Sequence, residues 1–125
     1  MVDCRIFIGL TVELARDLKS DDFRKIDDFM SKYPELDEYV GDPKLEGRIL
    51  LISDGMNGDF ARLIWVDKFR DDASLGSSNE FMELAAPNYC FNNEVVQKMF
   101  DLYEEYTGKS ATSADFKYAM WSQWY

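Results

Sequence analysis

The sequence predicts an α+β domain, with an antiparallel sheet of about four strands and two helices on one face, in the β-α-β-β-α-β order of ferredoxin-like folds. Three observations support this. Two short apolar runs flank a glycine-containing turn near the middle of the chain, an amphipathic segment lies on each side of that hairpin, and alternating apolar residues mark both ends. We expect the 125 residues to form a single domain, residues 1–125, around one core.

The first strand is predicted over residues 4–14, CRIFIGLTVEL, because every second residue is apolar. The residues of that face are Ile6, Ile8, Leu10, Val12 and Leu14. Gly9 falls on the opposite face, where a glycine within a strand indicates a bulge or a close approach of another backbone.

The first helix is predicted to begin at Ser20-Asp21-Asp22, where a hydroxyl can cap the helix and carboxylates favour its first turn. Apolar residues then recur at helical spacing, and Pro34 ends the run. These residues are Phe23, Ile26, Met30 and Tyr33. A further short helical turn over residues 34–40 would direct Leu36, Tyr39 and Val40 inward.

The central hairpin is predicted from two branched apolar runs, residues 49–52 and 63–66, joined by a turn that contains Asp54-Gly55 and Asn57-Gly58. Both faces of its second strand carry apolar residues, so we expect a central strand that is covered on both sides. One face holds Ala61, Leu63, Trp65 and Phe69, and the other holds Phe60, Ile64 and Val66.

The last third of the chain is predicted to hold a polar loop at residues 70–79, a short strand at 80–86, a helix and a tail. The helix has a broad apolar stripe, can be capped by Asn92 or Asn93, and ends at Gly108. The tail alternates as a strand does, through Phe116, Tyr118, Met120 and Trp124, whereas a helix capped by Thr112 or Ser113 is the alternative.

The residue types limit the chemistry. The chain contains no histidine, which removes the usual activation of serine or cysteine nucleophiles and the commonest metal ligand. Asp54, Asn57 and Asp59 do not match the spacing of a calcium loop. Cys90 precedes a helix and could be reactive, but a packed, inert thiol is the favoured interpretation. We therefore predict no cofactor, no metal and no catalytic residues, and we do not expect an enzyme.

Charge indicates the kind of partner. The chain has 24 acidic and 14 basic residues, a formal charge of −10 that disfavours nucleic acid and anionic membranes and favours a basic protein. A surface that serves solubility is the simpler alternative. The N-terminal residues do not resemble a secretory signal, no apolar run is long enough to span a membrane, and two unpaired cysteines suit a reducing compartment, so we expect a cytoplasmic protein.

The binding residues that we predict are acids of the second helix and aromatic residues of the tail, although core packing is the commoner role of such aromatics. They are Asp101, Glu104, Glu105, Trp121, Trp124 and Tyr125. The preferred hypothesis is a non-catalytic acidic protein-binding factor, such as an inhibitor, immunity protein or antitoxin. The alternative is a small-ligand-binding or regulatory module with an aromatic-lined pocket, and a histidine-free enzyme ranks last. The spare apolar sheet face also predicts a homodimer.

Overall fold

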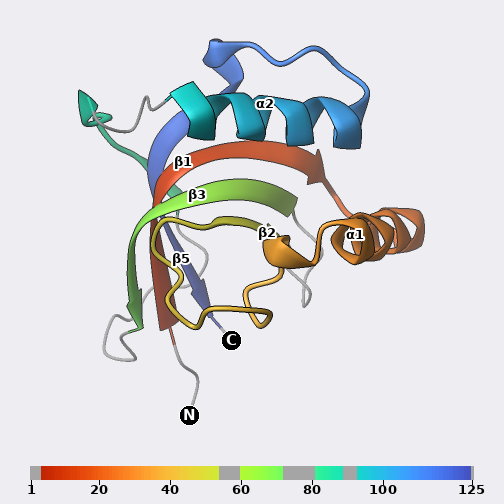
Figure 1. Ribbon diagram of the computed structural model, residues 1–125, viewed down its shortest axis with the longest axis horizontal. Coiled ribbons are helices and arrows are strands. Elements are labelled where there is room, and N and C mark those ends of the chain that lie inside the picture. The colour runs from red at the N-terminus through yellow and green to blue at the C-terminus, as the bar shows by residue number, and fades with distance from the viewer. Residues whose placement is uncertain (1–3, 54–59, 72–80, 89–92, 125) are drawn as a thin grey trace.

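The computed structural model describes residues 4–53, 60–71, 81–88 and 93–124. Its class is α+β, with two helices and an antiparallel sheet, as the sequence predicts (Figure 1). The elements are β1 (Cys4–Arg16), α1 (Ser20–Lys32), η1 (Pro34–Leu36), β2 (Ile49–Ser53), β3 (Phe60–Asp71), β4 (Phe81–Glu83), α2 (Asn93–Thr107), η3 (Ser113–Asp115) and β5 (Lys117–Trp124), where η denotes a 3₁₀ turn.

The sheet has five strands in the order β2-β3-β1-β5-β4, and every neighbouring pair is antiparallel. The first four strands of this order are compatible with a ferredoxin-like arrangement, to which the short β4 adds an outer edge. β2 and β3 form the predicted hairpin, with Leu50 opposite Ile64. The tail forms a strand, β5, and not the alternative helix.

Both helices pack on one face of the sheet, and Figure 1 shows α2 lying across the outer side of β1. From its apolar stripes the sequence predicts that Phe23, Ile26, Met99 and Phe100 pack over the hairpin. Ile26 of α1 and Met99 of α2 do lie in the same buried cluster as Leu63 of β3, whereas Phe23 and Phe100 are not part of it. The cluster also contains Leu10, Val12 and Leu14 of β1, Phe29 of α1, Leu36 of η1, and Leu102 and Tyr106 of α2. This is the main core of the domain.

The second face of the sheet is covered largely by the sheet itself. β1 and β3 bend strongly (Figure 1), and the ring of Phe60, at the start of β3, lies 5.1 Å from that of Trp121 in β5. A second buried cluster fills the curve and is completed by Leu45, from the segment before β2. Because this face is filled from within the chain, the spare surface behind the homodimer hypothesis is lost, and the homodimer stays a prediction without that support.

A bulge in β3 makes one predicted face wrong. Ile8 lies opposite Lys68 but Gly9 lies opposite Val66, so Asp67 is an extra residue in β3. The alternation therefore shifts, and Phe69 packs in the second cluster with the ring of Phe7 at 5.1 Å, not with Leu63 as predicted.

Gly9 lies beside this bulge. A Cβ atom at this position would lie 1.8 Å from the carbonyl oxygen of Trp65, so only glycine allows the two backbones to approach this closely. The prediction of a close approach at Gly9 is confirmed.

The start of α1 differs from the prediction in one detail. Lys19 is the N-cap residue and its backbone N–H donates to Asp22 Oδ2 at 2.9 Å, so a carboxylate and not the Ser20 hydroxyl satisfies the end of the helix. α2 ends as predicted, before Gly108 at φ +72°. The predicted turn residues 54–59, the polar loop from residue 72, the cap Asn92 and the thiol of Cys90 lie outside the described residues.

Candidate protein-binding surface

The segment between η1 and β2, residues 37–48, is here named the acidic loop. It carries four carboxylates and two cations and contains no helix or strand. Leu45 is buried in the second cluster, whereas Tyr39 and Val40 are 78% and 42% exposed. The prediction that Tyr39 and Val40 turn inward is therefore wrong, and only Leu36 does so, with no exposed surface.

The guanidinium group of Arg48 holds the backbone of the acidic loop together. Its Nη2 lies 3.0, 2.9 and 2.8 Å from the carbonyl oxygens of Glu35, Asp37 and Val40, so its two hydrogens serve three acceptors and one hydrogen is shared. Its Nη1 donates to the carbonyl oxygen of Asp42 at 2.7 Å. One planar cation thus joins four points of an otherwise irregular segment, and charged donors make stronger hydrogen bonds than neutral ones.

The base of the loop is fixed to the sheet. The N–H of Val66 donates to the carbonyl oxygen of Arg48 at 2.9 Å, and the N–H of Gly47 donates to the carbonyl oxygen of Val66 at 2.6 Å. Gly47 takes a φ of +86°, which glycine adopts without strain. The residue that organises the loop is therefore itself anchored on β3.

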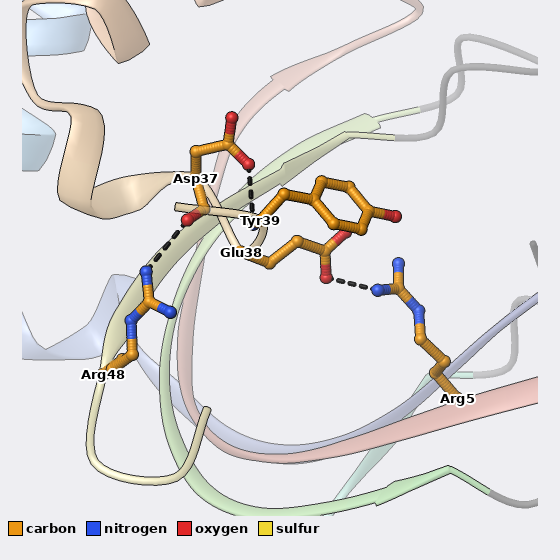
Figure 2. A network of polar contacts seen from close by, with 5 residues as sticks. All are labelled: Arg5, Asp37, Glu38, Tyr39 and Arg48. Atoms are coloured by element: carbon orange, nitrogen blue, oxygen red, sulfur yellow. Dashed lines mark hydrogen bonds and ion pairs between the residues drawn. The ribbon is translucent and has the colours of Figure 1, made fainter. Parts of the chain in front are cut away.

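A second anchor joins the loop to β1. Glu38 forms an ion pair with Arg5, and the two side chains are only 13% and 7% exposed (Figure 2). The Arg5 guanidinium carbon also lies 5.4 Å from the centre of the Phe7 ring. Glu38 is thus directed inward and contributes to the position of the loop, not to its exposed charge.

These anchors leave Tyr39 pointing outward. The N–H of Tyr39 donates to Asp37 Oδ1 at 2.9 Å, and the N–H of Val40 donates to the Asp37 carbonyl oxygen at 3.1 Å. Figure 2 shows that neighbouring residues of the loop point in different directions: the Asp37 carbonyl group points to Arg48, and the Glu38 side chain points to Arg5. An exposed tyrosine therefore projects from a backbone that is held on both sides.

A groove begins at the base of the loop. Its volume is about 390 Å³, and it runs from the Arg48 region to the first turns of α2. The half-buried ring of Trp65 contributes to its wall. The lining residues are Glu35, Gly47, Arg48, Ile49, Trp65, Glu94, Val95 and Lys98.

The three acids predicted on the second helix are exposed in α2. Glu105 Oε1 accepts hydrogen bonds from the Tyr33 hydroxyl at 2.8 Å and from Lys32 Nζ at 3.1 Å. These bonds, that of Tyr33 foremost, lower the pKa of Glu105, and the bond to Glu105 raises the pKa of Lys32. Glu105 thus links α1 to α2, whereas Asp101 accepts from Gln97 Nε2 on its own helix.

The predicted aromatic residues are not joined to these acids. Trp121 is 1% exposed and packs against Phe7 in the second cluster, so for this residue core packing holds. That cluster lies on the sheet face opposite α2. The side chain of Trp124 and the whole of Tyr125 lie outside the described residues.

Tyr39 and Arg48 were not among the predicted site residues. A helical reading of residues 34–40 placed Tyr39 inside, whereas Gly41, at φ +83°, ends the segment in a loop conformation. The signal available in the sequence was the local pattern DEYVGDP, an aromatic residue among carboxylates beside glycine and proline. No local sequence pattern predicts that the guanidinium group of Arg48 binds four carbonyl groups.

The described residues contain no group of three histidine, cysteine or acidic side chains placed to hold a metal ion. Within the same residues, none of the helices has the length and apolar character needed to cross a membrane.

Comparisons with models of protein families, with curated proteins and with solved structures found no match to this chain.

Proposed function

We propose that the protein is a non-catalytic acidic protein-binding factor and that the acidic loop is the element that engages a basic partner protein. The observation that carries the proposal is Tyr39, 78% exposed on a backbone held by Arg48 and by the Arg5 ion pair of Glu38. A loop with free ends would lose conformational entropy on binding, and a loop already fixed loses much less.

The chemistry of the loop suits a basic surface. Tyrosine is enriched among the residues that dominate binding energy, because it offers a large contact area with few rotatable bonds. The exposed carboxylate of Asp42 and the partly exposed carboxylate of Asp37 flank Tyr39. Charge of this sign increases the rate of encounter with a basic partner, while the aromatic ring slows dissociation.

The acids of α2 have a secondary role in this proposal. Asp101 and Glu104 are exposed, so they add to the field that attracts a basic protein without touching it. Glu105 is less suited to that role because it already binds Lys32 and Tyr33. We further propose a cytoplasmic location, where the partner and the reduced cysteines would share one compartment.

The test is affinity capture from a lysate of the source organism with the wild-type chain and with Tyr39→Ala, followed by elution with salt. The expected result is a basic protein that wild type retains and Tyr39→Ala loses. Lys44→Ala is the matched control, because Lys44 is exposed in the same loop but has the wrong charge for a basic partner. Equal capture by Tyr39→Ala and wild type would contradict the proposal.

A second candidate is favoured by the groove beside Trp65. Its volume of about 390 Å³ falls within the range of small-ligand sites, and an aromatic ring forms part of its wall. A regulatory module that binds a small ligand with both apolar and charged groups would use this groove, because half of its lining residues are charged. Native mass spectrometry of freshly purified protein would reveal such a ligand, and Trp65→Ala should then release it.

A further inference from the structure

A second cleft lies at the opposite end of β1 from Arg5. Its volume is about 570 Å³, and six consecutive residues of β1, Thr11 to Arg16, form one side of it. Tyr103 and Thr107 of α2 and Asp115 of η3 contribute to the facing side. The cleft therefore follows the length of a strand.

This part of β1 has a neighbouring strand on one side only, among the residues that the structure describes. Pairing with β5 ends at Thr11 opposite Lys117, whereas pairing with β3 continues to Arg16 opposite Phe60. In an antiparallel ladder, alternate residues direct their N–H and C=O groups to the same side. From Val12 to Arg16, β1 thus presents a strand edge to the cleft, in the stretch that runs beneath α2 in Figure 1. The edge is interrupted by a bulge at Leu14, because Glu13 lies opposite Arg62 and Ala15 lies opposite Ala61.

The charge of the cleft is opposite to that of the chain. Four cations line it, Arg16, Arg62, Lys109 and Lys117, against the acids Glu13 and Asp115. The protein as a whole has a formal charge of −10. A local excess of positive charge in such a chain marks a place where an acidic ligand is attracted and not repelled.

Both acids of the cleft already have partners. Glu13 Oε1 accepts from Arg16 Nε at 3.0 Å and lies 3.8 Å from Arg62 Nη2. Asp115 Oδ2 accepts from the Thr112 hydroxyl at 2.9 Å. The two arginines therefore compensate the charge of Glu13. On the rim, Lys117 Nζ lies 3.6 Å from Glu83 Oε2, but an exposed pair of this kind is weak, so Lys117 can exchange it for a carboxylate of a ligand that Lys109 also attracts.

We propose that this cleft binds an extended acidic segment of a partner protein, which adds as a strand alongside Val12–Arg16. A small anion would contact only part of the site, because five residues of strand span roughly 17 Å at about 3.3 Å per residue. A peptide satisfies the strand edge with its backbone and the cations with its carboxylates. This surface is distinct from the acidic loop and takes a partner of opposite charge, so it goes beyond the function proposed above.

The test uses three fluorescein-labelled ten-residue peptides and the full chain. One alternates Glu and Thr, and the second alternates Lys and Thr. The third alternates Glu and Pro with each Glu nitrogen methylated, which keeps the charge but leaves no backbone N–H group to donate to β1. Fluorescence anisotropy should show saturable binding of the Glu-Thr peptide. The other two should bind at least about tenfold more weakly. Equal binding of the Glu-Pro peptide would show adsorption by charge alone and would overturn the proposal.

Hydrogen exchange locates the peptide. The Glu-Thr peptide should slow exchange of backbone amides within residues 12–16, where a new strand would accept their hydrogen bonds. Protection elsewhere on the chain, or no protection at all, would contradict strand addition.

Charge reversal separates the cleft from general electrostatics. Lys109→Glu with Lys117→Glu should abolish binding of the Glu-Thr peptide. Arg24→Glu with Lys98→Glu changes the net charge equally at exposed positions outside the cleft and should weaken binding far less. Equal loss in both double variants would overturn the proposal. So would self-association that only the cleft variant abolishes, because the occupant would then be a second copy of the chain.

Discussion

Replacing Arg48 by methionine should loosen the acidic loop while the sheet stays intact. Methionine retains an unbranched side chain of similar length but cannot donate to the carbonyl groups that Arg48 joins. Three of the four bonds, those to Glu35, Val40 and Asp42, are exposed, and the bond to Asp37 is partly buried. Water can replace Arg48 at the exposed carbonyls but less readily at Asp37.

The expected cost follows from those exposures. An exposed hydrogen bond contributes about 0.5 kcal/mol net, and a partly buried bond from a charged donor about 1.5 kcal/mol. Because Nη2 has two hydrogens for three carbonyl groups, the four contacts of Arg48 together give at most about 3 kcal/mol, still a large fraction of the total stability of a domain of this size. Arg48→Lys keeps the charge but not the planar fork, so it should recover only part of this loss.

Urea denaturation monitored by circular dichroism measures the change, and hydrogen exchange at the amides of Tyr39 and Val40 reports the order of the loop. Arg24→Met, at an exposed position of α1, is the control and should change the free energy of unfolding by less than about 0.5 kcal/mol. If Arg48→Met matched this control and left exchange at Tyr39 and Val40 unchanged, Arg48 would not organise the loop.

Three further outcomes are expected. Gly9→Ala should destabilise the domain by about 3 kcal/mol or more, because its Cβ would meet the Trp65 carbonyl oxygen at 1.8 Å, and an unchanged urea midpoint would contradict this register. Tyr106→Phe should stabilise by about 1 kcal/mol, since the buried hydroxyl has no hydrogen-bond partner among the described residues. Burial also raises the pKa of Tyr106 above 10.0, so wild type loses stability as pH rises through that pKa, and the phenylalanine variant should not. If Tyr106→Phe were less stable than wild type at neutral pH, the unsatisfied hydroxyl would not be a cost. The pKa of Glu105 is lowered from its ordinary value of 4.5, so the Glu105 carboxylate stabilises the fold above pH 4.5, and this stabilisation is lost as pH falls through the folded pKa. Glu105→Gln should therefore flatten the acid side of a plot of stability against pH. An unchanged plot would count against the link between α1 and α2.

The arrangement of elements could be predicted from the sequence because it depends on periodicity. The runs at residues 49–52 and 63–66, and the helical stripes that place Ile26 and Met99 in one core, follow from spacing alone. Gly9 could be assigned a close approach because no other residue type permits one.

The errors have a common physical origin in features that depend on distant residues. The bulge at Asp67 moves Phe69 to the other face, and no residue near Phe69 signals it. The curvature that brings Phe60 to Trp121 joins strands that are not adjacent in the sheet. Tyr39 was placed inside because its spacing from Leu36 suits a helix, whereas the backbone there is fixed by Arg48, a residue beyond the predicted turn.

The measurement that tests the central claim most directly is the kinetics of binding to a captured basic partner, for wild type and Tyr39→Ala, as a function of salt. If the acidic loop steers and anchors the complex, the association rate should fall steeply as salt rises from about 0.1 to 1 M, where the screening length shrinks from about 10 to 3 Å. Tyr39→Ala should leave that association rate nearly unchanged and raise the dissociation rate by tenfold or more, about 1.4 kcal/mol. A dissociation rate unaffected by Tyr39→Ala, with association independent of salt, would contradict the account.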